Sequence, residues 1–415
     1  MTVAANAAPA PGEADRDAGF LQGLLLALVP TTIVIATCVA LPILPAVVKA
    51  FPNQANIAEM VPLIAVLPTL AVAFTALAAG ILGEKIGRRL LLILGTAVFA
   101  VSSLAPMVLN DFILILVSRG ITGLAIGVMI TSAVALTADY FSGATLQRWL
   151  GAQGGAAAIA GVVVSFASGA LGEVSWRYAF LPLAIGVPLF LGLLLVPAPK
   201  AQSPAAATVA NEAMSGAAAI PWRTWLAVFA ISVVGTAIIF PPAYEAGAMV
   251  QEKALGSSFM TGAAVAVLAA GAAGAAFSLG WLRMLSAQIK VAIAIAAAGI
   301  GTFLMATSTA LVPFMAGSAI VGIGQGMLGP VLSIWLLEGT AEKLRGRAVG
   351  IYQTVTFLTL FVSPLVARQL AVALHASSGA MRIYMIADAL MVLALAPTFF
   401  RRRQAIPAPV VTEAA

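Results

Sequence analysis

The chain has 415 residues, of which 62% are hydrophobic and only 9% are charged. An ordinary soluble domain has about 25% charged residues, so this composition excludes a water-soluble globular protein. The net charge of +6 is spread thinly between apolar runs, which excludes a basic face that binds nucleic acid.

Twelve apolar stretches are long enough to cross about 30 Å of hydrocarbon, which takes roughly 20 helical residues. We therefore predict an all-α membrane protein with twelve transmembrane helices in two halves of six. The predicted helices lie near 19–45, 59–82, 90–109, 112–138, 148–172, 177–196, 221–245, 257–281, 288–308, 312–338, 346–372 and 380–400.

Polar segments divide the chain into parts. The first residues lack the basic start and short apolar run of a cleaved signal, which predicts a cytoplasmic tail. The longest polar interruption is rich in alanine and proline, which predicts a linker. The predicted parts are a cytoplasmic tail at 1–18, a six-helix bundle at 19–196, a cytoplasmic linker at 197–220, a second six-helix bundle at 221–400 and a cytoplasmic tail at 401–415.

Lysine and arginine in short loops are retained on the cytoplasmic side, so their distribution predicts the orientation. With the N-terminus inside, fifteen of the 21 Lys and Arg residues lie on the cytoplasmic side and five on the other, while Arg119 lies inside the membrane. We therefore predict a multi-pass protein of a bacterial inner membrane, with both termini in the cytoplasm.

The two halves repeat at a constant offset of 199 residues. The matching pairs are Pro42 with Pro241, Gly123 with Gly322, Gly127 with Gly326, Asp139 with Glu338, Arg148 with Arg347 and Gly151 with Gly350. An offset of six helices preserves helix direction, so we predict parallel repeats about an axis along the membrane normal. A ligand is then expected between the halves, near the midplane.

The turn after the second stretch reads Gly80-Ile-Leu-Gly-Glu84-Lys85-Ile-Gly87-Arg88-Arg89. Its glycines permit a tight reversal at the bilayer surface, and its cations anchor the turn inside. The string resembles the signature Gly-x-Leu-x-Asp-Arg-x-Gly-Arg-Arg of the major facilitator superfamily. The resemblance implies a cytoplasmic gate in which the acid, here Glu84 in place of Asp, docks at the start of the eleventh helix. A basic turn that only sets topology is the alternative.

Arg119 begins a second signature, Arg119-Gly-Ile-Thr122-Gly123, roughly 10 Å along the axis of the fourth helix. It resembles the Arg-x-x-x-Gly signature of transporters in the same superfamily. An arginine at this depth is expected to face the bundle interior, water or a carboxylate. Two roles stay open: a partner for a proton relay or substrate anion, and a structural arginine paired with a helix end or with Asp111.

A proline pattern near the end of the first helix, Leu41-Pro42-Ile43-Leu44-Pro45, resembles the Pro-x-x-Pro of twelve-helix drug:proton antiporters. An ordinary proline pair at a membrane exit is the alternative. The fifth stretch lacks the Gly-Pro dipeptide that marks antiporters, which weakens the inference of proton exchange. The resemblance covers all twelve helices and is closest to the drug:proton antiporter type.

Two acid–base pairs flank cytoplasmic loops at the same spacing, Asp139 with Arg148 and Glu338 with Arg347. Exposed pairs are each worth about 0–1 kcal/mol, so they lock a conformation only as a network. We predict a cytoplasmic gate, with solvation of the surface as the alternative. Its residues are Gly80, Glu84, Lys85, Gly87, Arg88, Arg89, Asp139, Arg148, Glu338 and Arg347.

Helices one, four, seven and ten are expected to line a cavity that is apolar with few polar groups, which suits an amphipathic or aromatic ligand. Asp388 is the one carboxylate expected well inside the membrane, and a structural role is its alternative. The candidates for a substrate or proton pathway are Arg119, Thr31, Thr32, Thr37, Thr122, Gln153, Thr236, Gln325, Trp335, Tyr352, Gln353 and Asp388.

The single cysteine, Cys38, and the single histidine, His375, exclude a disulfide framework and a metal centre built on either residue type. No Gly-x-x-x-x-Gly-Lys-Ser/Thr loop indicates ATP, and no acid–base cluster indicates an enzyme. We predict a monomeric secondary transporter without cofactors that exports small amphipathic compounds, with protons as the coupling ion. Import of an organic anion held by Arg119 is the alternative, and a non-transporting receptor is a further one.

Overall fold

The computed structural model describes residues 19–141, 143–195, 221–279, 281–282, 284–340, 342–375 and 377–400. Within these residues the regular structure is entirely helical, as predicted from the hydropathy. The predicted tails, 1–18 and 401–415, and the predicted linker, 197–220, lie outside the described residues.

The first half of the described chain crosses the molecule six times. The first crossing consists of α2 (Phe20–Leu28), α3 (Thr31–Cys38), η1 (Leu41–Ile43) and α4 (Leu44–Ala50). The second consists of α5 (Ile57–Met60) and α6 (Leu63–Ile86), and the third of α7 (Arg88–Ser102) and η2 (Ala105–Met107). The last three are α8 (Phe112–Tyr140), then α9 (Gly143–Val174), then η3 (Tyr178–Ile185) with α10 (Gly186–Leu195).

The second half repeats this pattern. Its first crossing consists of α12 (Trp222–Ile239) and α13 (Pro241–Glu252). The others are α14 (Ser258–Ser278), α15 (Ala287–Thr307), α16 (Leu311–Glu338), α17 (Glu342–Ala373) and α18 (Ser377–Phe400). Among the described residues, ten helices are long and apolar enough to cross a membrane, and Leu63–Thr75 adds a shorter apolar helix. The twelve crossings agree with the count predicted from the sequence.

Prolines interrupt the first crossing of each half. Pro42 lies in η1 and Pro45 in the first turn of α4, while Pro241 and Pro242 begin α13. Proline has no N–H to donate to the preceding turn, so the helix stops and starts again at each site. The crossing predicted at 221–245 therefore continues beyond its break to Glu252.

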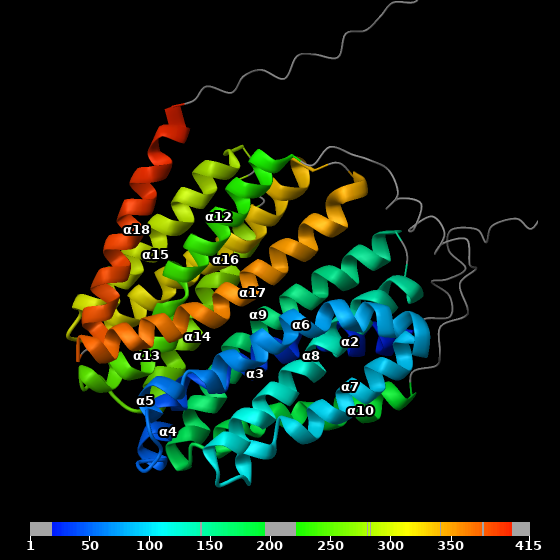
Figure 1. Ribbon diagram of the computed structural model, residues 1–415, viewed down its shortest axis with the longest axis horizontal. Helices are drawn as coiled ribbons and strands as arrows, with labels where there is room; N and C mark the ends of the chain where they lie inside the picture. The colour runs from blue at the N-terminus through cyan, green and yellow to red at the C-terminus, as the bar shows by residue number, and fades with distance from the viewer. Residues whose placement is uncertain are drawn as a thin grey trace, which may run out of the picture.

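Each half has its own hydrophobic core. Phe99, Ile115 and Phe180 are fully buried in the first core, and Trp225 and Phe314 are almost completely buried in the second. In Figure 1 the two groups of helices, coloured blue to green and green to red, accordingly form two bundles side by side.

Glycines let equivalent helices approach closely in the two bundles. A Cβ atom on Gly123 of α8 would collide with the backbone of Pro68 in α6. A Cβ atom on Gly322 of α16 would collide with the backbone of Leu268 in α14. The offset of 199 residues relates the two glycines, so these small residues serve helix packing, as the small-xxx-small spacing predicts.

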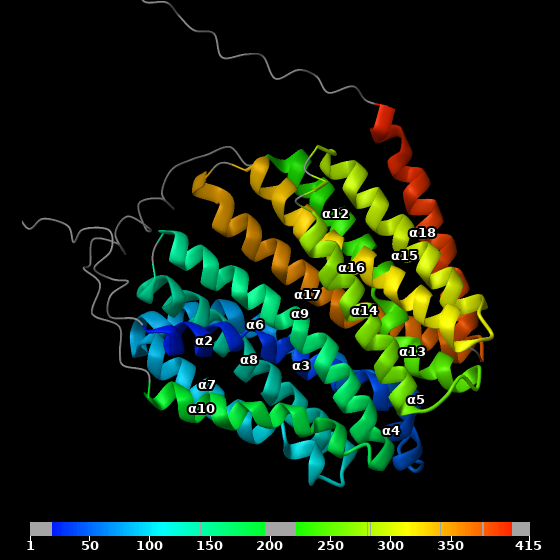
Figure 2. The same cartoon turned by 180° about the vertical axis from the view of Figure 1, so that it is seen from behind.

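The bundles converge at one end of the molecule and diverge at the other (Figures 1 and 2). We call the end where α10 finishes and α12 begins the linker end, and the opposite end the closed end. At the closed end α9 packs on α14, where the Oε1 atom of Glu173 accepts a hydrogen bond of 2.7 Å from the backbone N–H of Phe259. Toward the linker end, α9 and α17 move apart in both views.

Candidate functional site

A central cavity of about 430 Å³ lies between the two bundles. Helices α3, α6 and α9 supply its wall on one side, and α13, α14, α16 and α17 supply it on the other. Its lining residues are Ile33, Val34, Thr37, Cys38, Leu41, Thr69, Ala157, Ala158, Gly161, Phe240, Ala243, Tyr244, Val265, Leu268, Ala269, Ala272, Ala273, Ala276, Gln325, Gly326, Phe357 and Leu360.

Gln325 contributes a side-chain amide to this cavity. The helix break at Pro241-Pro242 explains the position of this amide. At the Pro241-Pro242 break the N–H of Ala243 donates to Phe240, so it does not donate to Ile239, its helical partner four residues back. The Nε2 atom of Gln325 donates to that carbonyl of Ile239 instead, at 3.2 Å. The side-chain oxygen of Gln325 is a further acceptor that a bound molecule can use.

Two threonine hydroxyls of the cavity are already partly satisfied by hydrogen bonds. The hydroxyl of Thr37 donates to Ile33 at 3.0 Å, and that of Thr69 donates to Val66 at 2.6 Å, each within its own helix. Each hydroxyl oxygen keeps acceptor capacity. Aromatic rings and alanine methyl groups form most of the rest of the wall, so the cavity suits a mostly apolar or aromatic molecule with few hydrogen bonds.

Thr37 and Gln325 are the two predicted pathway residues that line this cavity. Thr31 and Thr32 are buried and donate to backbone carbonyls one turn back in their own crossing. Thr236 is buried in α12, at 2% exposure.

Other predicted pathway residues lie within one bundle. Thr122 donates to Ser118 at 2.8 Å, and Gln153 donates to Thr137 at 3.4 Å, both in the first bundle. In the second bundle the hydroxyl of Tyr352 donates to the carbonyl of Gly329 at 3.3 Å. Trp335 packs against the core of the second bundle, and Gln353 is exposed on the same bundle.

Arg119 is fully buried in the first bundle and binds two backbone carbonyls. Its Nε donates to Ile64 at 2.9 Å, and its Nη2 donates to Ala36 at 2.5 Å. Its guanidinium also lies 5.6 Å from the centre of the Phe180 ring. Asp111, the carboxylate considered as a partner, instead caps α8 by accepting from the N–H of Leu114.

Both carbonyls lack their usual helical donor. Pro68 lies inside α6, four residues after Ile64, and has no N–H to donate. Ala40, four residues after Ala36, donates to Thr37 because α3 ends there. Arg119 of α8 therefore donates hydrogen bonds to the first two crossings at carbonyls that their own helices leave without a donor. It does not line the central cavity.

Asp388 lies between α18 and α15 and is 1% exposed. A Cβ atom on Gly299 of α15 would lie 3.0 Å from its Cβ atom, and neither carboxyl oxygen has a hydrogen-bond partner in the structure. That Asp388 is the one carboxylate well inside the membrane stays a prediction, and Glu245 is a second buried carboxylate. Glu245 is 3% exposed in the apolar span Trp222–Glu252, because α13 continues past its proline break.

The residues of the predicted cytoplasmic gate lie at the linker end. The Nη1 atom of Arg88 binds Oδ1 of Asp139 at 2.8 Å, within the first bundle, where the sequence pairs Asp139 with Arg148. Gly87 has a φ of +91°, which a glycine accommodates at the sharp turn between α6 and α7. Arg89 donates to Leu194 at 3.2 Å.

The rest of that predicted set is exposed or lies outside the described side chains. Lys85, Arg148 and Glu338 are exposed. The side chains of Glu84 and Arg347 lie outside the described part, as does the exposure of Gly80. The docking of Glu84 at the start of α17 therefore stays a prediction.

The sequence predictions missed the contribution of α6 and α14 to the cavity wall, and they expected a contribution from α8, which supplies no described residue to the wall. A signal was present in the alanine- and glycine-rich stretch 262–276, whose small side chains leave space beside the helix. Glu245 was missed because the predicted helix ended at its position.

Comparison with known proteins is consistent with this geometry. A family model described as Major Facilitator Superfamily matches residues 24–364. An uncharacterized MFS-type transporter, EfpA of Mycobacterium tuberculosis (strain ATCC 25618 / H37Rv), is 33% identical over 121 residues. That match covers 29% of this chain and only 22% of the relative.

Solved structures share the fold at low identity. A D-xylose-proton symporter superposes with a TM-score of 0.74 at 16% identity, covering 91% of this chain and 97% of that one. A bacterial homologue of the human lysosomal transporter Spinster, in an inward-facing and occupied conformation, gives a TM-score of 0.72 at 14% identity. That superposition covers 91% of this chain and 95% of the homologue.

Proposed function

Because the chain belongs to the major facilitator superfamily and is a membrane transporter rather than an enzyme, we propose that it exports small amphipathic or aromatic compounds in exchange for protons. The central cavity between the bundles is the observation that carries this proposal. Both bundles contribute to its wall, so a change in their relative tilt changes access to a bound molecule.

The chemistry of the cavity supports the class of substrate. Phe240, Tyr244 and Phe357 offer aromatic faces, and Gln325 with Thr37 offers a few hydrogen-bonding groups. Among the described residues that line the cavity there is no Lys, Arg, Asp or Glu. An apolar wall with few polar groups binds amphipathic molecules by burial of area more than by fixed hydrogen bonds.

The arrangement of the bundles supports transport by alternating access. The excess of Lys and Arg assigns the linker end to the cytoplasm and the closed end to the outside of a bacterial inner membrane. In that orientation the bundles diverge on the cytoplasmic side and converge on the outer side (Figures 1 and 2). Rocking of the bundles about the central cavity then opens the closed end. We propose that one chain suffices for this cycle.

The alternative, import of an organic anion held by Arg119, has weaker support. The guanidinium of Arg119 already binds Ile64 and Ala36, and the residue does not line the central cavity. An anion there would compete with two buried carbonyls for the same donors.

Proteoliposomes provide the test. A panel of amphipathic, aromatic and anionic compounds is offered under an imposed pH gradient, and we expect an amphipathic compound to move against its own gradient. The matched control collapses the pH gradient with a proton ionophore, which should reduce the movement to equilibration. A compound that exchanges freely while none responds to the pH gradient would contradict proton coupling. Uptake of an anion alone would favour the importer.

A further inference from the structure

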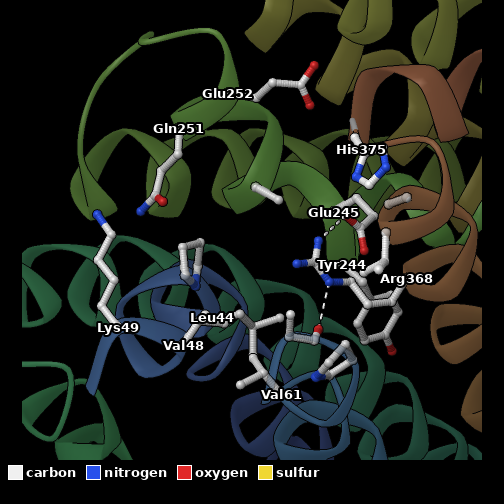
Figure 3. Close-up of a pocket in the computed structure, with 16 residues that line it drawn as sticks. Leu44, Val48, Lys49, Val61, Tyr244, Glu245, Gln251, Glu252, Arg368 and His375 are labelled. Carbon is white, nitrogen blue, oxygen red and sulfur yellow. Dashed lines mark hydrogen bonds and ion pairs between the residues drawn. The ribbon is translucent and has the colours of Figure 1, made fainter. Parts of the chain in front are cut away.

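A second cavity, of about 580 Å³, lies at the closed end between the two bundles (Figure 3). It is distinct from the central cavity and shares only the lining residue Tyr244 with it. Its wall contains Glu245 and Arg368, which point toward one another in Figure 3. Neither residue has a part in the cavity proposed to hold substrate.

Arg368 of α17 connects the two bundles at this cavity. Its Nε donates to the carbonyl of Ala58 in α5 of the first bundle, at 2.7 Å. Its Nη1 lies 3.4 Å from Oε2 of Glu245 in α13 of the second bundle. The side chain of Glu245 is 4% exposed and that of Arg368 is 20% exposed, so water screens this ion pair less than a surface pair. We call these three residues the latch.

The internal repeat shows that the latch is specific to one side of the closed end. The offset of 199 residues places Gly169 of α9 at the position equivalent to Arg368. A Cβ atom on Gly169 would lie 3.0 Å from the carbonyl oxygen of Ser258 and 2.9 Å from the Cα atom of Gly262. Gly169 thus makes a close backbone approach between the bundles. Arg368, its repeat-related counterpart, instead donates a hydrogen bond across the bundles to Ala58 and pairs with Glu245 within the second bundle.

We propose that Glu245 is a proton-binding site that controls opening of the closed end. The ionised carboxylate holds the guanidinium of Arg368 in the orientation that reaches Ala58. A proton taken up by Glu245 from the solution at the closed end removes the negative charge and frees Arg368 to leave Ala58. The proposal rests on the alternating access proposed above, but it requires no particular substrate.

Other charged or titratable groups surround Glu245, and the test must distinguish their pH response from that of Glu245. Tyr384 of α18 lies within electrostatic reach of the carboxylate. The wall of the cavity adds Lys49 of α4, Tyr244 and Glu252 of α13, and His375 after α17. His375 is exposed and its imidazole can also bind a proton, so it is the competing candidate that the test must separate from Glu245.

The test measures opening of the closed end without substrate. Spin labels at Ala55 and Thr309, exposed positions on opposite bundles, are introduced in a Cys38→Ser background because Cys38 is the single native cysteine. The distance distribution is recorded in lipid nanodiscs at pH 8 and at pH 5. We expect the ratio of open to closed populations to rise by about tenfold at pH 5, as the loss of one charge-assisted hydrogen bond predicts.

Variants assign the response to one residue. Glu245→Gln preserves shape and removes the charge, so its open population should be raised at both pH values. Glu252→Gln is the matched control, since it removes an exposed carboxylate from the same helix and cavity and should titrate like the parent. His375→Ala should keep the response.

Three results overturn the proposal: a distance distribution in the parent that does not change with pH, a closed Glu245→Gln variant at pH 8, or a response lost in His375→Ala and kept in Glu245→Gln. The flux assay separates this outcome from the proposed function. If Glu245→Gln opens the closed end but the protein moves no compound with the pH gradient, the proposed role of Glu245 stands and the proposed proton coupling is refuted. If the pH gradient drives flux but the closed end does not respond to pH, proton coupling stands and the proposed role of Glu245 is refuted.

Discussion

Replacement of Arg119 by leucine should destabilise the first bundle, and a second substitution should recover part of the loss. Arg119→Leu removes the donors to Ile64 and Ala36, two buried carbonyls that their own helices leave without a donor. Hydrogen bonds between membrane helices contribute about 0.6 kcal/mol on average and up to about 1.7 kcal/mol. Two of them therefore amount to about 1–3 kcal/mol of the free energy of unfolding.

Pro68→Ala supplies the N–H that α6 lacks, so the carbonyl of Ile64 regains a helical donor. The cost of Arg119→Leu should then be smaller by about 0.6–1.7 kcal/mol in the Pro68→Ala background. The cost of burying a guanidinium changes equally in both backgrounds and cancels in this double-mutant cycle. Unfolding in mixed micelles with increasing sodium dodecyl sulfate, followed by tryptophan fluorescence, measures each corner of the cycle.

The matched control is Pro364→Ala, which removes a proline from the interior of α17 in the other bundle. It should add to Arg119→Leu within about 0.5 kcal/mol, as distant sites do. The reasoning would be refuted by equal costs of Arg119→Leu in the parent and Pro68→Ala backgrounds. It would also fail if Arg119→Leu left stability unchanged and abolished substrate binding.

Three further predictions concern the cavity, the closed end and the linker end. Gln325→Leu should weaken binding of a transported compound by about tenfold, while Gln353→Leu, at an exposed position outside the cavity, should leave it unchanged in a fluorescence titration. Gly169→Ala should hinder closure, since its methyl group meets backbone atoms at 2.9–3.0 Å, and the open population between the spin labels should rise; an unchanged distribution would contradict the close approach. Asp139→Asn should cost about 0–1 kcal/mol in the same unfolding assay and leave the distances unchanged, because its partner Arg88 is in the same bundle and partly exposed.

Hydropathy predicted the crossings well because each must bury about 20 residues in lipid, and this requirement is local in the sequence. The breaks at Pro42 and Pro241 have a similarly local cause, because a missing N–H acts on its own helix wherever the helix lies. The parallel repeat was evident from matching residues, of which Gly123 and Gly322 make equivalent contacts.

The wall of the cavity could not be predicted in the same way, because it depends on how helices of the two bundles cross. Arg119 illustrates the limit: its depth predicted an interior position, but the sequence alone did not reveal that Pro68, more than fifty residues earlier, leaves the carbonyl that it binds. Glu245 illustrates another limit of the sequence. Its burial follows from the continuation of α13 beyond a proline break, where the apolar pattern weakens.

The central claim is that substrate passes through the cavity between the bundles, and a steric plug tests it most directly. Ala273 of α14 lines the cavity, and Ala270, one turn earlier, is exposed outside it. Transport by the Ala273→Trp and Ala270→Trp variants is compared in proteoliposomes under one pH gradient, after equal incorporation has been verified. The account predicts that the first variant loses transport and the second retains it. Transport by Ala273→Trp at the rate of the parent would contradict the account.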